Sequence, residues 1–140
     1  MSHYVVDANV SVKWFVPEVL TPQALRLLGG DHHLMAPDLV YTEAGNALWQ
    51  KVRRAQLTAA QARRVLSGIV GAPLEVHSTR ELVTLGLELA LESGCTVYDG
   101  CYLGLAISRE CQLVSADARL EGLLPARYRR HFLSLASVRA

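Results

Sequence analysis

Short apolar segments alternate with longer segments of helical periodicity along this chain, and the alternation limits the folds open to it. Extended strands are expected over five segments: His3–Asp7, Leu34–Ala36, Leu74–His77, Leu113–Ser115 and Phe132–Leu135. Helices between consecutive strands allow the strands to run parallel, because a parallel connection has to cross back over the sheet. The sequence therefore predicts an α/β fold whose central parallel sheet is covered on both faces.

Capping residues and glycines mark the ends of the expected helices. The first helix should begin with Thr21 as the N-cap ahead of Pro22 and should stop at Gly29-Gly30. Asp38 is expected to cap a helix that runs to about Arg54. Two capping boxes open the next two helices: Thr58 with Gln61 begins one that runs to about Val70, and Ser78 with Glu81 begins one that ends near Gly94. A last helix is expected from about Tyr98 to Glu110.

The 140 residues are expected to form one domain, residues 1–140. A hydrophobic fraction of 51% against 19% charged residues indicates a globular chain rather than a disordered one. Because we find neither an apolar stretch of membrane-spanning length nor a signal peptide, we expect a cytoplasmic location and no membrane contact. Cys95, Cys101 and Cys111 have no CxxC spacing, which argues against a disulfide framework or a zinc site.

Basic residues occur in three local clusters, although the net charge is only +1. The clusters are Lys51 with Arg53 and Arg54, Arg63 with Arg64, and Arg127 with Arg129 and Arg130. Each cluster by itself is best interpreted as the solvated face of a helix. Taken together, the clusters could guide a polyanion toward a pocket.

Four acidic residues lie where a stable core alone would not place them. Asp7 ends the first expected strand and Asp117 follows the fourth, while Glu43 and Asp99 fall on the apolar rows of two expected helices. Buried carboxylates are rare unless they are paired or bind a metal. In α/β sheets, ligands bind beyond the carboxyl ends of the strands. We therefore expect the four to converge there, if the two helices follow their strands directly.

Each of the four positions also has a structural explanation to weigh. Asp7 and Asp117 could close strand-to-helix turns, and Asp99 could be a helix N-cap. Glu43 is harder to explain in this way, because a carboxylate inside a helix has no capping role. The departure of all four from the pattern favours a functional interpretation.

Charge repulsion supplies a reason for a cation among converging carboxylates. Two carboxylates about 4 Å apart repel each other by roughly 4 kcal/mol at an effective dielectric constant of about 20. Carboxylate oxygens are ligands for Mg²⁺ and Mn²⁺, which can activate water and neutralise a phosphate oxygen. The residues therefore favour an enzyme that acts on phosphate esters.

Four segments, in this order and spacing, resemble the PIN-domain ribonucleases, and most closely the VapC-type toxins of toxin–antitoxin pairs. They are residues 5–10 (VVDANV), 37–43 (PDLVYTE), 98–106 (YDGCYLGLA) and 113–117 (LVSAD). Each segment alone is a weak signal, but the ordered set is specific and covers essentially the whole chain.

The resemblance implies a three-layer α/β/α PIN-like domain that acts as a Mg²⁺- or Mn²⁺-dependent endoribonuclease on RNA. It carries catalytic and metal-binding roles onto Asp7, Glu43, Asp99 and Asp117. Supporting polar roles follow in the same way for Asn9 and Ser115. It also implies a homodimer and inhibition by a cognate VapB-type antitoxin.

Two helices carry further expectations. Gly100 and Gly104 stand where such proteins often have alanine, and because glycine lowers helix propensity we expect weaker local order near Asp99. Residues 82–91 are apolar almost all round, which predicts burial on two sides, within the domain or against a second subunit.

Trp14 and Trp49 are interpreted as packing residues rather than as platforms for base stacking.

Three other functions stay open on the sequence. The same site would serve a nuclease of DNA or a phosphoesterase with another substrate. A phosphoaspartyl-transfer phosphatase is disfavoured, because such enzymes need a second Asp where this chain has Asn9. A catalytically silent PIN-like binding module would use the four acids for structure only.

Overall fold

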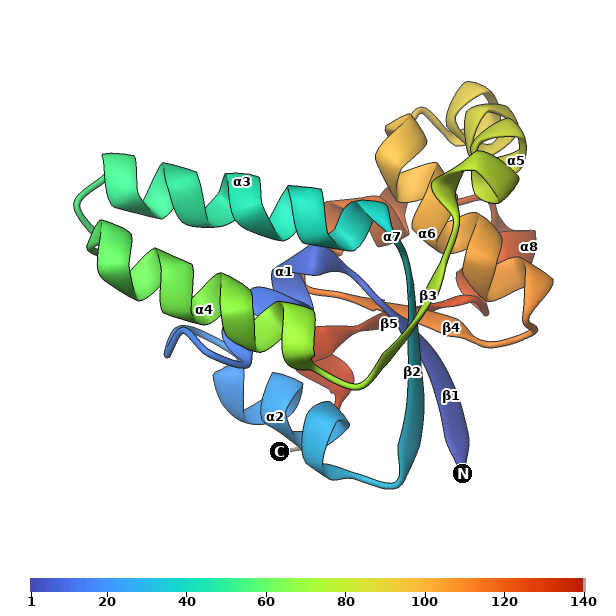
Figure 1. Ribbon diagram of the computed structural model, residues 1–140. Coiled ribbons are helices and arrows are strands. Elements are labelled where there is room, and N and C mark those ends of the chain that lie inside the picture. Colours follow the sequence, from blue (N-terminus) through green and yellow to red (C-terminus); the bar gives the residue numbers. More distant parts are fainter. Residues whose placement is uncertain (140) are drawn as a thin grey trace.

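Five parallel strands form the centre of the fold, in the order β3-β2-β1-β4-β5 (Figure 1). The computed structural model describes residues 1–139. The strands are β1 (Ser2–Val6), β2 (His32–Pro37), β3 (Leu74–His77), β4 (Gln112–Ser115) and β5 (Phe132–Ser134). The central strand β1 pairs with β2 on one side and with β4 on the other. All five predicted strands are confirmed, with bounds that differ by one or two residues where they differ.

The helices predicted from capping and periodicity are also confirmed, and three short ones were missed. The long helices are α2 (Thr21–Gly29), α3 (Leu39–Arg53), α4 (Ala59–Gly71), α5 (Thr79–Ser93) and α6 (Val97–Ser108). The missed ones are α1 (Ala8–Lys13), α7 (Ala118–Leu123) and α8 (Ala126–Arg129), and a 3-10 turn, η1, covers Leu135–Ser137. Helices of four to six residues are too short to show a helical period in the sequence.

Of the predicted side-chain caps, that of Thr58 is confirmed, whereas those of Ser78 and Asp38 differ from the structure. The capping box of Thr58 and Gln61 is formed, with both reciprocal hydrogen bonds present. The box predicted at Ser78 is wrong, because the Asp38 carboxylate accepts hydrogen bonds from the backbone N–H of Thr79 (3.0 Å) and from its hydroxyl. Asp38 therefore caps α5, the helix that follows the neighbouring strand β3, instead of its own helix α3.

The start of α2 also departs from the prediction. Leu20 is its N-cap, in the left-handed region at φ 70°, and no side chain caps the helix. The Thr21 hydroxyl instead donates to the Val16 carbonyl (3.1 Å) and accepts from the Glu18 N–H (3.0 Å). Thr21 thus fixes the loop before the helix rather than the helix itself.

The sheet is covered on both faces because alternate strand residues point to opposite sides. Val5, Met35 and Leu113 belong to the core beneath α6, whereas their neighbours Val6, Leu34 and Val114 pack with residues of α1 and α2. In Figure 1, α5 and α6 lie on one side of the sheet and α2 on the other, and α3 and α4 form a hairpin that extends away from it. This is the expected three-layer α/β/α arrangement.

Two-sided burial of α5 within the domain is wrong. Its buried residues, Leu82, Gly86 and Leu89, face α6. The opposite face leaves Val83, Leu87 and Leu91 exposed, by 42%, 46% and 71% of their surfaces. Within residues 1–139, no helix is both long enough and apolar enough to cross a membrane.

Glycines allow α5 and α6 to cross at very close range. A Cβ atom added to Gly100 would overlap the backbone carbonyl of Gly86, and one added to Gly86 would lie 3.0 Å from the Cys101 sulfur. Gly86 and Gly100 therefore serve the packing of two helices, whereas the weaker local order expected near Asp99 stays a prediction.

Candidate functional site

Asp7 lies at the junction of β1 and α1 and is almost completely buried, with 8% of its surface exposed. Its N–H donates to the Val114 carbonyl (3.1 Å), which extends the pairing of β1 with β4. Its carboxylate accepts hydrogen bonds from the Ser115 hydroxyl (2.9 Å) and from the Asn9 N–H (3.4 Å). Asp7 is the N-cap of α1 as well, so the capping explanation applies to it.

Asn9 and Ser115 join the two strand ends at this point. The Asn9 amide donates to the Ser115 oxygen (3.2 Å) and accepts from the Ala116 N–H (3.1 Å). The same Ser115 oxygen accepts from the Asp117 N–H at 3.1 Å. These bonds fix the turn after β1 against the turn after β4, and they fix Asp7 with it.

Glu43 enters the site from the second turn of α3, next to the buried residue Ala44. Its Oε1 atom is buried without a hydrogen-bond partner, and so is the hydroxyl of Tyr102 on α6. Tyr102 is 1% exposed, and its hydroxyl lies close enough to Glu43 to oppose the burial that raises the Glu43 pKa. Neither oxygen, however, meets the geometry of a hydrogen bond.

Tyr102 was missed as a polar member of the site by the sequence reasoning. The signal was its position three residues after Asp99, on the same row of the helix. An aromatic residue in an apolar helix is ordinarily a core residue, so a polar role for its hydroxyl was not predicted.

Asp99 and Asp117 differ in how far structure alone explains them. Thr96 caps α6 by accepting from the Asp99 N–H (3.0 Å), so the interpretation of Asp99 as an N-cap is wrong. Asp117 does cap α7, accepting from the Arg119 N–H at 3.1 Å, and it also lies 3.4 Å from the Arg119 Nε atom. Asp99 therefore has a carboxylate free for another purpose, whereas Asp117 has a structural one.

The electrostatics indicate that the four carboxylates converge. Burial, together with the charges of Glu43 and Asp99, raises the pKa of Asp7 to about 7 against the opposing hydrogen bond from Ser115. Burial and then Asp99 raise the pKa of Glu43, although Tyr102 opposes this. Burial and then Asp117 raise the pKa of Asp99, with Thr96 opposing. Each carboxylate is thus within electrostatic range of another.

The convergence arises by a different route from the one expected for α6. Helix α3 follows β2 directly, as assumed, but α6 follows α5 across a left-handed turn at Gly94 and leads into β4. Helix α6 packs across β1, β2 and β4, and Asp99 near its first turn comes within range of Asp7. Figure 1 shows the starts of α1, α3 and α7 close together above the sheet.

A divalent cation fits the donor set of this site. Within residues 1–139, no three His, Cys, Asp or Glu side chains lie close enough to enclose an ion by themselves. Mg²⁺ does not need such a cage, because it keeps several waters and binds through one or two carboxylates. The unpartnered Glu43 oxygen, the unpartnered Tyr102 hydroxyl and the raised carboxyl pKa values are what a hydrated cation would relieve.

Comparison with known proteins identifies the family. The model of the PIN domain family matches residues 4–123, which is most of the chain. The chain belongs to the PIN domain family. A relative of this PIN domain, Ribonuclease VapC3 from Pyrobaculum aerophilum, is 35% identical over 124 residues, which cover 87% of this chain and 95% of that protein. The resemblance to VapC-type PIN domains is thereby confirmed.

Solved structures agree on the fold of this PIN domain. The crystal structure of PAE2754 from Pyrobaculum aerophilum has a TM-score of 0.66 at 25% identity, covering 97% of this chain and 85% of that one. VapBC2 from Rickettsia felis, bound to a DNA fragment from their promoter, has a TM-score of 0.67 at 15% identity, covering 94% and 98%. The second likeness, at that identity, concerns the fold alone.

Proposed function

We propose that this PIN domain is a Mg²⁺- or Mn²⁺-dependent endoribonuclease, the toxin of a toxin–antitoxin pair. One observation carries the proposal. The pKa values of Asp7, Glu43 and Asp99, which come from three separate segments, are raised by burial and by neighbouring carboxylates, Asp117 among them, around a Glu43 oxygen that has no partner. The name of the relative Ribonuclease VapC3 supports RNA as the substrate.

The proposed roles follow from the surroundings of each residue. Asp7, Glu43, Asp99 and Asp117 would hold a hydrated cation between them, one or two of them as direct ligands and the others through its waters. Ser115 and Asn9 keep the Asp7 carboxylate aimed into the site through their hydrogen bonds. When bound, the metal would lower the pKa of a coordinated water and neutralise charge on the phosphate.

Cleavage of a labelled single-stranded RNA tests the proposal. We expect cleavage with Mg²⁺ or Mn²⁺, none with EDTA, and a loss of at least a hundredfold in Asp7→Asn, because oriented metal ligands supply several kcal/mol of the barrier reduction. Cleavage that survives both EDTA and Asp7→Asn would disprove the mechanism. A DNA of the same sequence, assayed in parallel, distinguishes a ribonuclease from a nuclease of DNA.

The partners proposed are a VapB-type antitoxin and a second copy of the chain. The antitoxin is supported by the solved complexes of similar fold, VapBC2 from Rickettsia felis and a toxin-antitoxin complex from Klebsiella pneumoniae. The homodimer is supported by the exposed apolar face of α5. A cytoplasmic location accompanies this proposal, since the RNA substrate is found there.

A further inference from the structure

The α3–α4 hairpin, residues 39–71, is strongly basic in its outer part. From Ala44 to Leu74 the sequence has five Lys and Arg residues and neither Asp nor Glu. Because the whole chain has a net charge of only +1, the remainder of the molecule is net negative. Two of the three basic clusters seen in the sequence therefore meet on one projecting element.

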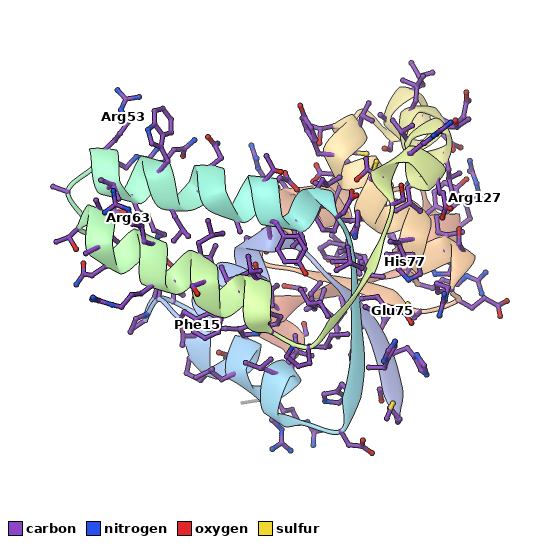
Figure 2. All side chains as sticks on the ribbon, in the orientation of Figure 1. Phe15, Arg53, Arg63, Glu75, His77 and Arg127 are labelled. Carbon is purple, nitrogen blue, oxygen red and sulfur yellow. The ribbon has the colours of Figure 1, made fainter. Side chains whose placement is uncertain are left out.

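Four arginines of this hairpin are available to an external anion. Lys51 is occupied, because it shares the Glu18 carboxylate with Lys13 at 2.7 and 2.9 Å. Arg53, Arg54, Arg63 and Arg64 are exposed, and within residues 1–139 none of them is paired with a carboxylate. Figure 2 shows Arg53 at the outer end of α3 and Arg63 in the space between α3 and α4.

Trp49 is exposed among these arginines, and its interpretation as a packing residue is wrong. Its side chain is 54% exposed, and the Arg53 guanidinium lies 4.9 Å from the ring centroid. An exposed aromatic ring paired with a cation and bordered by other cations is the composition of a surface that stacks nucleobases. Trp14, by contrast, is buried and donates to the Ala24 carbonyl at 2.9 Å, as a packing residue would.

The indole borders two hollows of different character. One, of about 240 Å³, is an apolar furrow between α3 and α4, lined among others by Leu48, Leu66 and Arg63. The other, of about 350 Å³, is lined by Trp49, Gln50, Arg53 and Arg54. A nucleotide has one apolar and one anionic part, and these hollows offer a place for each on either side of one ring.

The surface is continuous with the carboxylate site. Thr42, Asn46, Gln50 and Arg53 are exposed at spacings of four, four and three residues, and so form a stripe along α3. The stripe begins beside Glu43 and ends at the outer end of the helix, about 15 Å further at 1.5 Å per residue. A strand whose phosphate lies at the carboxylates could therefore follow α3 outward.

We propose that the α3–α4 hairpin is the binding arm for single-stranded RNA, with a base stacked on Trp49 and backbone phosphates held by Arg53, Arg54 and Arg63. The identity of the polyanion rests on the proposed function. The charge of the arm favours a nucleic acid as its occupant, because backbone phosphates would pair with four exposed arginines that no carboxylate within residues 1–139 neutralises.

Binding is measured by the fluorescence anisotropy of a labelled, unstructured RNA oligomer in Mg²⁺, on an Asp7→Asn background that prevents cleavage. We expect Trp49→Ala to weaken binding about tenfold and Trp49→Phe to restore most of it, because a phenyl ring still stacks. Removing two phosphate contacts by Arg53→Gln with Arg63→Gln should reduce the slope of log K against log salt by about 1.4. The matched control is Arg26→Gln with Arg80→Gln, which removes the same charge from exposed positions on α2 and α5.

Cleavage assays without the Asp7 change separate this proposal from the function on which it rests. The arm variants should lose cleavage of the oligomer but retain cleavage of a dinucleotide, which has no second phosphate to reach the arm. If the unmodified protein binds the oligomer but cleaves neither substrate, the proposed catalysis fails while the arm is still supported by the binding losses. If the arm variants bind the RNA with the same affinity as the control variant, the proposal that the hairpin binds RNA is disproved. The same follows if the variants keep RNA binding and lose only their inhibition by the antitoxin, since the arm would then be a protein-binding surface.

Discussion

Asp7 combines a structural role with a charge that its surroundings disfavour. As the N-cap of α1 and a partner of Ser115, it joins β1 to β4. As a buried carboxylate near Glu43 and Asp99, it has a pKa of about 7. The fold thus holds Asp7 firmly in a position where its ionised form is poorly stabilised unless a cation is bound.

The raised pKa of Asp7 predicts how stability varies with pH in EDTA. The folded state keeps this proton up to about pH 7, whereas the unfolded chain releases it near 3.8, so the free energy of unfolding falls as pH rises from about 4 to 7. Asp7→Asn removes this dependence. Between pH 5 and pH 8 it should gain roughly 3 kcal/mol of stability relative to the parent, at about 1.4 kcal/mol per pKa unit.

Urea unfolding at the two pH values measures this difference. Equal differences between variant and parent at pH 5 and pH 8 would show that Asp7 titrates as an exposed carboxyl does. Adding Mn²⁺ to the parent at pH 8 should recover stability, because an ion that binds only the folded state stabilises it.

The sequence singled out four carboxylates that the structure brings within electrostatic range of one another, but it did not predict what surrounds them. Glu43 was identifiable because a helix-interior carboxylate on an apolar row has no structural reason. The Tyr102 hydroxyl was not, because only the packing of α6 on β1 and β2, the strand that leads into α3, reveals that it lies next to Glu43. Trp49 was misjudged because the hydrophobicity of an indole does not say which side of a hairpin it occupies.

At the scale of elements, the crossing of α5 and α6 is set by missing side chains. The two helices pack against each other at close range, with Gly100 lying against the Gly86 backbone at the crossing. The sequence showed a glycine that lowers helix propensity, whereas the close approach of Gly86 and Gly100, which are 14 positions apart, depends on tertiary structure. The bounds of the helices and strands were predictable from the sequence, because capping residues and hydrophobic periodicity are local features.

Gly100→Ala should destabilise the fold by about 1–3 kcal/mol, because the added methyl group would overlap a backbone carbonyl that cannot move without shifting α5. Thermal or urea unfolding measures the loss. Gly122→Ala is the matched control, because nothing lies within 4 Å of its Cβ position in α7. Alanine should there be neutral or stabilising by up to about 1 kcal/mol. Equal effects at the two positions would contradict the close crossing.

For the whole molecule, the outer face of α5 is the surface that a second copy would cover. Val83, Leu87 and Leu91 recur every four residues on that face and are all exposed. Burying such side chains would contribute roughly 25 cal/mol for each Å² of apolar surface removed from water. The alternative that a second subunit covers this face of α5 stays a prediction.

Leu87→Glu should convert the proposed dimer to a monomer, as measured by light scattering on a size-exclusion column, because a carboxylate would be buried without a partner. Leu25→Glu on α2 is the matched control, since Leu25 is exposed to nearly the same extent, 44% against 46%. A parent protein that elutes as a monomer at all concentrations, or a loss of dimer in both variants, would refute this interface.

The link between Asp7 and Ser115 has a consequence for synthesis on the ribosome. These residues are 108 positions apart, and β1 cannot pair with β4 until the last quarter of the chain has emerged. A nascent chain that ends before β4 already carries Asp7, Glu43 and Asp99 but lacks the hydroxyl and the strand that hold Asp7 in place. Products of translation that end before β4 would therefore lack a fixed Asp7, and the proposed activity would be confined to longer chains.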